Sequence, residues 1–154
     1  ARLARRSSAA TRAVAAAPAS AEARYGRARA RLALDDPSGA GLDLDRAVEL
    51  DPELAPAWAL RGTLRGSQGE VDLARSDLGI ALELDPDRAA WWQERAVLDL
   101  AADDPRAARE AASRALALDP TLRAAWRLRA EAREALGDAE GASADREASR
   151  ALGR

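Results

Sequence analysis

A period of 34 residues runs through the sequence and constrains the fold more than any other feature. The tripeptide Leu-Asp-Pro recurs at this spacing, beginning at Leu50, Leu84 and Leu118. Tryptophan follows the same period, at Trp58, Trp92 and Trp126. Two interleaved series with one period are the signature of a repeat architecture, in which each unit buries its apolar face against its neighbours. We therefore expect one continuous repeat domain.

Turn residues divide each period into two helices. An Asp before a Pro, as at Asp36-Pro37, is typical of a helix N-cap with proline at the first helical position. The Asp-Pro after each second helix should stop that helix and cap the next one. The expected first helices are 21–34, 53–67, 87–102 and 121–136. The expected second helices are 37–50, 71–84, 105–118 and 139–152.

The repeat resembles the tetratricopeptide repeat (TPR), whose pattern runs from a Trp through small residues to a closing Pro. One unit matches that pattern at Trp58, Gly62, Ala74, Leu78, Ala81 and Pro86. The resemblance covers residues 21–154, although Arg24 stands at the Trp position of the first unit. It implies an all-α fold: an α-solenoid of antiparallel helix pairs in a right-handed superhelical stack.

The period predicts about four TPR units after an N-terminal half-unit. Residues 1–18 are expected to form the second helix of a preceding unit, because Pro18 lies 34 residues before Pro52. The units that follow are expected at 21–54, 55–88, 89–122 and 123–154, the last with a more polar, capping-like final helix. A start inside a unit favours a fragment of a larger protein. The alternative is an Ala- and Arg-rich targeting peptide near the start of a protein otherwise expected in the cytoplasm.

The composition excludes most catalytic chemistry. The chain has no Cys, His or Lys, so it lacks a thiolate, the usual acid–base group at neutral pH and the amine that forms Schiff bases. The adjacent acids Asp35-Asp36 and Asp103-Asp104 precede prolines, so they are interpreted as helix caps rather than as acid–base pairs. We therefore expect no enzyme activity, cofactor or metal. The absence of Lys also favours a GC-rich bacterial genome over selection of Arg for phosphate binding.

Arginine and aspartate form a further phased series. Arg stands three residues after each Trp position, and in three units an Asp follows sixteen residues later. In an antiparallel hairpin this separation should bring the two side chains together, so we predict bidentate ion pairs between Arg27 and Asp43, Arg61 and Asp77, and Arg129 and Asp145. Ala111 interrupts the series, so Arg95 should use Glu110 or another acid. The alternative is an arginine stripe that binds phosphate groups.

The phased Trp and small residues are expected to build the helix packing. Trp58, Trp92 and Trp126 should fill the space between paired helices, and Gly62 should lie where two helices cross closely. Trp91 lies outside the phased series. It either packs between units or is a hot spot for binding.

The resemblance also implies a binding surface. In the TPR family the first helices line a concave groove that holds peptides or partner helices, and residues one and five places after the Trp usually face it. These positions are Tyr25, Arg29, Ala59, Thr63, Gln93, Val97, Arg127 and Glu131. Chaperone-binding members use a clamp of Lys and Asn residues, which this chain lacks, so co-chaperone function of that kind is not expected.

The sequence favours a non-catalytic protein–protein interaction scaffold that binds a protein or peptide partner. A second hypothesis is nucleic-acid or polyanion binding, because residues 1–31 hold eight Arg and one acid, whereas the rest hold 16 Arg and 25 acids. A third is a regulatory module of a fused enzyme. Opposite charges at the two ends also allow head-to-tail self-association. No membrane span is expected, because the sequence has no run of 18 apolar residues.

Overall fold

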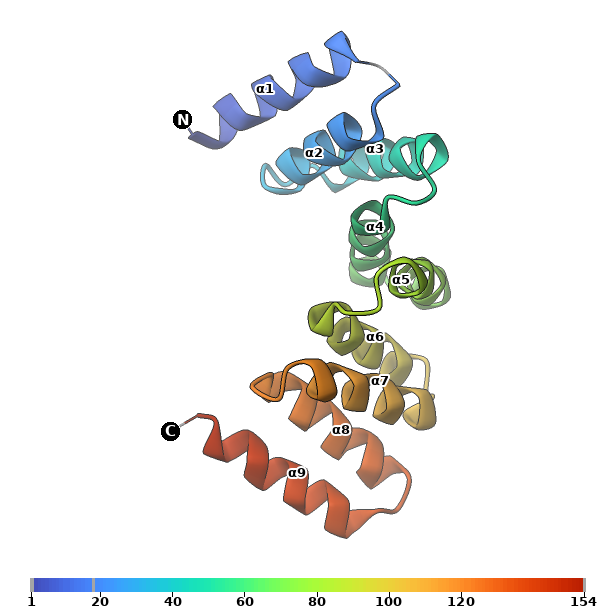
Figure 1. Cartoon of the computed structure of the whole chain (residues 1–154), viewed down its shortest axis with the longest axis vertical. Helices are drawn as coiled ribbons and strands as arrows, with labels where there is room; N and C mark the ends of the chain where they lie inside the picture. Colours follow the sequence, from blue (N-terminus) through green and yellow to red (C-terminus); the bar gives the residue numbers. More distant parts are fainter. Residues whose placement is uncertain (1, 18, 154) are drawn as a thin grey trace.

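The computed structural model describes residues 2–17 and 19–153, and this part of the chain forms nine α-helices and no strand (Figure 1). Pro18, which aligns with Pro52, lies outside the described residues. The helices are α1 (Arg2–Ala16), α2 (Ala21–Leu32), α3 (Pro37–Leu50), α4 (Ala55–Ser67), α5 (Val71–Leu84), α6 (Ala89–Ala101), α7 (Pro105–Leu118), α8 (Arg123–Ala135) and α9 (Ala139–Ala151).

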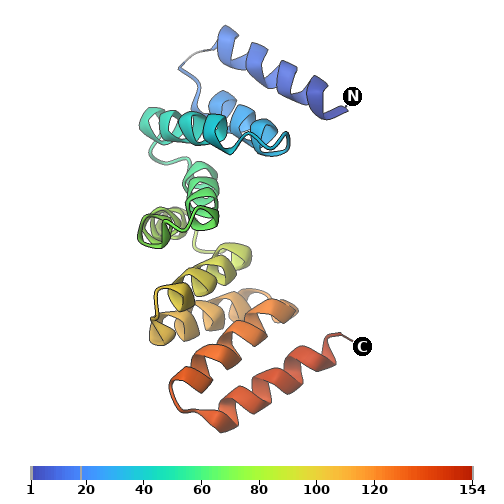
Figure 2. The same ribbon diagram turned by 180° about the vertical axis from the view of Figure 1, so that it is seen from behind.

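The helices stack as antiparallel pairs along the long axis of the molecule, with α1 and α9 at opposite ends (Figures 1 and 2). The most extensive contacts lie within the pairs α2–α3, α4–α5, α6–α7 and α8–α9. Further contacts join neighbouring pairs, such as α3 with α4 and α6 with α8, and α1 packs on α2. Because contacts are confined to neighbours in the stack, the fold is an all-α solenoid.

Alanine and leucine at helical spacing build the core. On α3, Ala40, Leu44 and Ala47 are completely buried, and the residues of the same phase on α5 and α7 are buried as well. Alanine contributes little apolar area, but it lets helix axes approach closely. The 34-residue period in the sequence therefore corresponds to a repeated crossing of small side chains.

Gly62 on α4 lies at one of these close crossings, against the backbone of α5. A Cβ atom on Gly62 would lie 3.1 Å from the carbonyl oxygen of Ala74 and 3.3 Å from the amide nitrogen of Leu78. These are backbone atoms of α5, so they cannot turn away as a side chain can. Gly26 on α2, two residues before the position equivalent to Gly62, has open space, with nothing within 4 Å.

Substitution of Gly62 should therefore destabilise the protein. Gly26→Ala should raise the free energy of unfolding by up to about 1 kcal/mol, because alanine favours helix. Gly62→Ala should give no such gain, and Gly62→Leu should lower the free energy of unfolding by about 1–3 kcal/mol through overpacking. Urea unfolding followed by circular dichroism measures all three variants. Equal effects of alanine at the two glycines would contradict the close crossing.

The turn inside each unit depends on a left-handed residue. Positive φ angles of 61°, 81°, 56° and 83° occur at Asp35, Gly69, Asp103 and Gly137, which follow the 34-residue period. The expectation that both acids of each adjacent pair are caps is thus half right. Asp36 accepts a hydrogen bond from the Gly39 amide at 2.8 Å, whereas Asp35 holds the left-handed conformation that Asp tolerates better than most residues. Asp104 is likewise the cap of α7.

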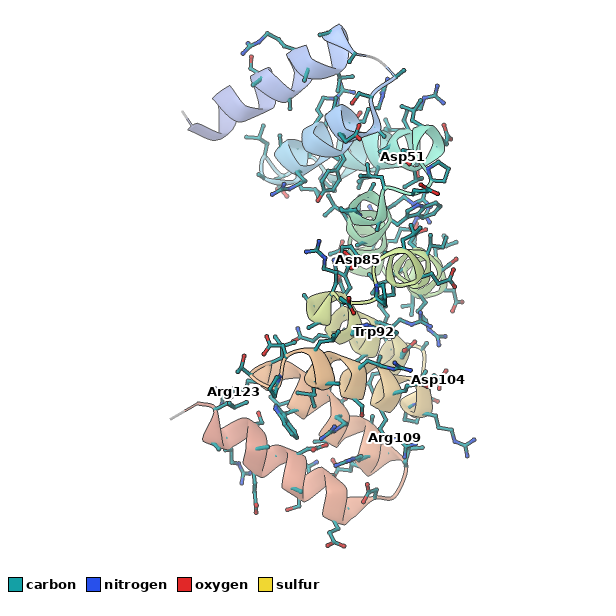
Figure 3. The ribbon with its side chains drawn as sticks, in the orientation of Figure 1. Asp51, Asp85, Trp92, Asp104, Arg109 and Arg123 are labelled. Atoms are coloured by element: carbon teal, nitrogen blue, oxygen red, sulfur yellow. The ribbon has the colours of Figure 1, made fainter. Side chains whose placement is uncertain are left out.

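The turn between units corrects a second expectation. Leu-Asp-Pro ends α3, α5 and α7, but its Asp does not cap the next helix (Asp51 and Asp85 are labelled in Figure 3). The Asp51 carboxylate accepts a hydrogen bond from the Glu53 amide at 3.0 Å, two residues along the chain. This local turn delays the next helix. Helices α4, α6 and α8 begin at Ala55, Ala89 and Arg123, without a side-chain cap.

The Trp and Leu-Asp-Pro series meet in one repeated contact. The indole N–H of Trp58 donates to the Pro52 carbonyl at 2.9 Å. Equivalent bonds join Trp92 to Pro86 at 2.7 Å and Trp126 to Pro120 at 2.9 Å. The Trp58 ring also packs on the core clusters of two units, so this side chain fills the junction between units as well as the space between paired helices.

Candidate functional site

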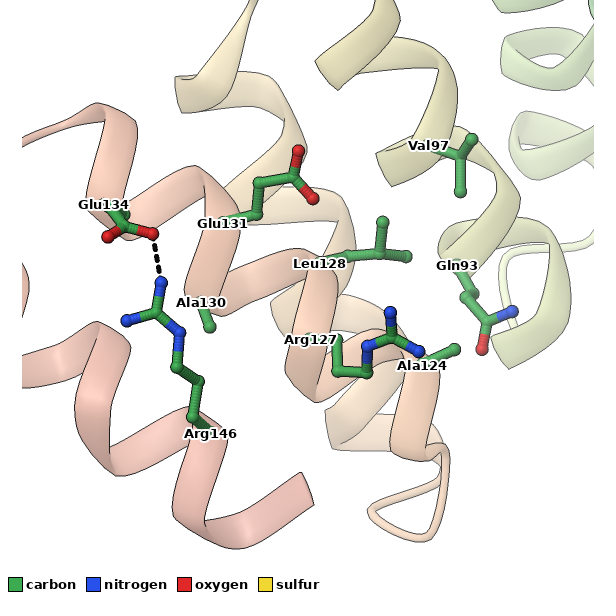
Figure 4. Close-up of a pocket in the computed structure, with 9 residues that line it drawn as sticks. All are labelled: Gln93, Val97, Ala124, Arg127, Leu128, Ala130, Glu131, Glu134 and Arg146. Atoms are coloured by element: carbon green, nitrogen blue, oxygen red, sulfur yellow. Dashed lines mark hydrogen bonds and ion pairs between the residues drawn. The ribbon is translucent and has the colours of Figure 1, made fainter. Parts of the chain in front are cut away.

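A cavity of about 510 Å³ opens between the first helices α6 and α8, with α9 at one side (Figure 4). Two of its lining residues come from α6, six from α8 and one from α9. They are Gln93, Val97, Ala124, Arg127, Leu128, Ala130, Glu131, Glu134 and Arg146. We call this feature the α6–α8 groove.

Four of the eight sequence-predicted groove residues line the α6–α8 groove. Gln93 and Val97 stand one helical turn apart on α6, and Arg127 and Glu131 repeat that spacing on α8. Both pairs line the same opening because each first helix repeats the orientation of the one before it. The period thus identifies positions on two helices that share one opening.

The other four predicted groove residues lie outside this cavity. Ala59 is only 3% exposed and belongs to the core around Leu78, so it lines no open surface. Tyr25 packs on the core of the first unit, and the guanidinium of Arg29 lies 5.8 Å from its ring centroid. Thr63 is exposed on α4.

The walls of the α6–α8 groove combine apolar and charged groups. Val97 is 47% exposed, which is unusual for a large aliphatic side chain, and Leu128 faces the same opening. Arg127 and Glu131 carry opposite charges at the surface, and Glu134 forms an ion pair with Arg146 of α9. An aliphatic floor with charged edges suits a polypeptide segment better than a small polar metabolite.

The three predicted Arg–Asp pairs are present in the structure. Arg27 donates from Nε and Nη2 to the two carboxylate oxygens of Asp43, at 2.7 and 2.5 Å. This hydrogen bond to Asp43 raises the pKa of Arg27 above its ordinary value. The same two-pronged geometry, with distances of 2.7–2.9 Å, joins Arg61 to Asp77 and Arg129 to Asp145.

A second arginine joins each pair, and sequence reasoning missed it. Arg31, Arg65 and Arg133 stand one helical turn after the first arginine and approach the same buried carboxylates at 2.8–3.0 Å. Their shared phase in the repeat was available as a signal. Asp43, Asp77 and Asp145 thus each bridge at least two arginines of the opposite helix.

The third unit has a different arrangement, and Glu110 is not part of it. Arg95 donates to Asp99 on its own helix at 2.9 Å. Arg75 of the preceding unit donates to the same carboxylate at 2.7 Å and to Asp104 at 3.1 Å. Asp99 is 1% exposed and therefore takes the place of the Asp that Ala111 replaces. The ion pair consequently crosses between units here.

Known structures share this arrangement of helices. MamA matches with a TM-score of 0.88 and 19% identity over 95% of this chain and 85% of that one. YrrB, described as a TPR protein with an unusual peptide-binding site, matches with a TM-score of 0.88 and 18% identity over 94% and 74%. MamA from Desulfovibrio magneticus RS-1 gives 0.81 and 19% over 88% and 77%. No family model and no curated protein matches the sequence.

This chain has a tetratricopeptide-repeat fold. The likeness extends over nearly the whole chain, as the 34-residue period predicts. At these levels of identity it establishes the arrangement of the TPR helix pairs, while the groove chemistry comes from the residues of this chain. No helix among residues 2–17 and 19–153 is both long enough and apolar enough to cross a membrane.

Trp91 packs against the preceding TPR unit. Its ring contacts the core cluster that contains Ala59 and Leu82, and the Arg88 guanidinium lies 5.6 Å from the ring centroid. The side chain is therefore partly buried between units. This position supports the packing interpretation over the binding hot spot.

Glu94 is a further acid on the first-helix surface. It lies on α6, where partial burial raises its pKa and a hydrogen bond with the Thr63 side chain of α4 acts in the opposite direction. Gln93 and Val97 stand one residue before and three residues after it on α6. Glu94 thus lies at the edge of the α6–α8 groove that faces α4.

Proposed function

We propose that this TPR chain is a non-catalytic protein-interaction scaffold that binds a peptide segment or a partner helix in the α6–α8 groove. One observation carries the proposal: the groove positions of two successive first helices converge on a single cavity with an exposed aliphatic floor. A solvent-exposed valine beside a leucine gains stability when a partner's apolar side chain covers it. The likeness to YrrB, a TPR protein described as having a peptide-binding site, supports the same function.

The buried charges of this chain support a structural role rather than catalysis. Asp43, Asp77, Asp99 and Asp145 are the four buried acids of the described residues, and each is held by two or more arginines. A carboxylate that is buried and ion-paired in this way is shielded from any substrate. The ion pairs fix one helix against the other.

The same pairs weaken the case for polyanion binding. Arg24, Arg27 and Arg31 of α2 all lie within 4 Å of the Asp43 carboxylate, so much of the positive charge of that helix is used inside the fold. The phased arginines of α4 and α8 are engaged in the same way. The interaction scaffold is therefore the function that the geometry favours.

A charged residue in the floor of the groove should prevent binding. We expect the protein to select peptides from a displayed library of random dodecapeptides, and Val97→Asp to weaken their binding by about tenfold or more through the loss of apolar burial. Fluorescence anisotropy with labelled selected peptides measures the change. Leu73→Asp is the matched control, because Leu73 is 51% exposed on the second helix α5. Equal affinity of both variants for the peptides would contradict the proposed groove.

A further inference from the structure

Among the described residues, every buried or partly buried acid except Glu94 either pairs with arginine or accepts a hydrogen bond from a backbone amide, as Asp51 and Asp119 do. The four buried aspartates each have guanidinium partners, as described above. Glu94 is partly buried, yet no ion pair of the described residues includes it. The nearby Thr63 side chain is uncharged, and its hydroxyl donates to the Ala59 carbonyl at 3.0 Å. The chain has 24 basic residues, all of them Arg, but none of them forms an ion pair with the Glu94 carboxylate among the described residues.

The position of Glu94 relates it to the α6–α8 groove. A residue on α6 rises about 1.5 Å per position, so Glu94 lies within about 5 Å, along the helix axis, of both Gln93 and Val97. Those two residues line the groove, and Thr63 beside Glu94 is exposed on α4. A ligand that covers Val97 can therefore extend across α6 to reach the carboxylate from solvent.

We propose that Glu94 binds a Lys or Arg side chain of the peptide that occupies the groove, next to an aliphatic side chain that covers Val97 and Leu128. The inference rests on the proposed function and adds the chemical class of the partner: a peptide with a basic residue beside an aliphatic one. A partly desolvated carboxylate is stabilised by a cation that also donates hydrogen bonds. A single carboxylate offers too few ligands for a metal ion, and it repels the phosphates of nucleic acid.

In the free protein, the partly buried carboxylate of Glu94 lowers the free energy of unfolding. Burial disfavours the charged form of Glu94, as the raised pKa shows, so Glu94→Gln should leave the folded state at pH 7 at least as stable as the wild type. A purely structural acid would show the reverse, because its removal would lower the unfolding temperature. Thermal unfolding of Glu94→Gln thus separates a binding role from a packing role.

The deciding experiment compares peptides and variants in a double-mutant cycle. Wild-type protein selects dodecapeptides from the random library, and the selected peptides should be enriched in Lys or Arg beside Leu, Ile or Val. Anisotropy should show that Glu94→Gln weakens such a peptide by about tenfold. Replacing the basic peptide residue with Gln should weaken the wild type by the same factor but leave Glu94→Gln unaffected. Glu110→Gln, an equal charge change on the exposed surface of α7, should bind like the wild type.

Each possible result tests a different statement. If the peptides show no basic enrichment, or if Glu94→Gln binds them as tightly as the wild type while Val97→Asp does not, the role of Glu94 is overturned and the groove stands. The role is also overturned if Glu94→Gln unfolds at a lower temperature and weakens all peptides equally. If Val97→Asp has no effect either, or if no peptide is selected, the proposed function falls as well.

Discussion

Replacing Trp92 with Ala should lower the free energy of unfolding by about 3–5 kcal/mol. The Trp92 ring packs against three core clusters: those around Leu78, Ala112 and Leu116. It therefore holds together elements of the second, third and fourth helix pairs. Its indole N–H also donates to the Pro86 carbonyl, which would lose that partner. Few residues of a solenoid touch so many parts of the core, so truncation leaves a cavity that neighbouring helices cannot close.

Trp91 offers a matched control for this prediction. It is the adjacent residue of the same helix and the same type, but it packs against only one of those clusters and makes no equivalent indole hydrogen bond among the described residues. Trp91→Ala should therefore cause a clearly smaller loss, of about 1–2 kcal/mol. Urea unfolding followed by circular dichroism gives both values. Similar losses would show that the three-cluster contact of Trp92 adds nothing to stability.

Asp43→Ala should lower the free energy of unfolding by about 3 kcal/mol or more, because several guanidinium groups would lose their shared carboxylate partner. The Asp43 side chain is 2% exposed and accepts from Arg27 at 2.5 Å and Arg31 at 2.9 Å, with Arg24 at 3.7 Å. Removing the acid leaves three positive charges close together on α2, where no carboxylate at position 43 offsets their mutual repulsion. Neither solvent nor another acid fully replaces it.

Asp45→Ala tests whether burial, rather than charge alone, produces this effect. Asp45 lies on the same helix two residues later, is half exposed and pairs with Arg61 at 2.9 Å. The same substitution there changes helix propensity equally, but should lower the free energy of unfolding by less than about 1 kcal/mol. The two variants are compared by urea unfolding at one ionic strength. A loss at Asp45 as large as that at Asp43 would contradict the assigned role of the buried pair.

The sequence predicts the second helices better than the first. Helices α3, α5 and α7 have the expected bounds, because a turn or proline precedes each one and Leu-Asp-Pro ends it. Helix α2 begins at Ala21 as expected, but α4, α6 and α8 begin two residues later than expected. Before α4, the Asp51 carboxylate accepts a hydrogen bond from a nearby amide instead of capping the helix start. That choice depends on local hydrogen bonding, which a pattern of residue types does not resolve.

The period also predicts which helix positions face the same way better than it predicts which side chains are exposed there. It relates Val97 on α6 to Glu131 on α8, which line the same cavity, because equivalent positions on successive helices face the same way. It cannot show that Ala59 is covered by α5 or that Arg29 lies against Tyr25, because those outcomes depend on the size of neighbouring side chains. The burial of Glu94 is likewise a property of two packed helices.

The displaced ion pair of the third unit makes the repeats unequal as folding modules. In the other three units the Arg–Asp contact closes within one hairpin, so it contributes to the intrinsic stability of that hairpin. In the third unit, Arg75 connects Asp99 and Asp104 to the preceding hairpin, so part of the stabilisation exists only as a nearest-neighbour coupling. The second unit also pairs with its predecessor, through Arg61 and Asp45, but it keeps the Arg61–Asp77 pair inside its own hairpin. The third unit has no such pair across its own hairpin among the described residues, so its buried carboxylate depends on the preceding repeat for one of its two arginines.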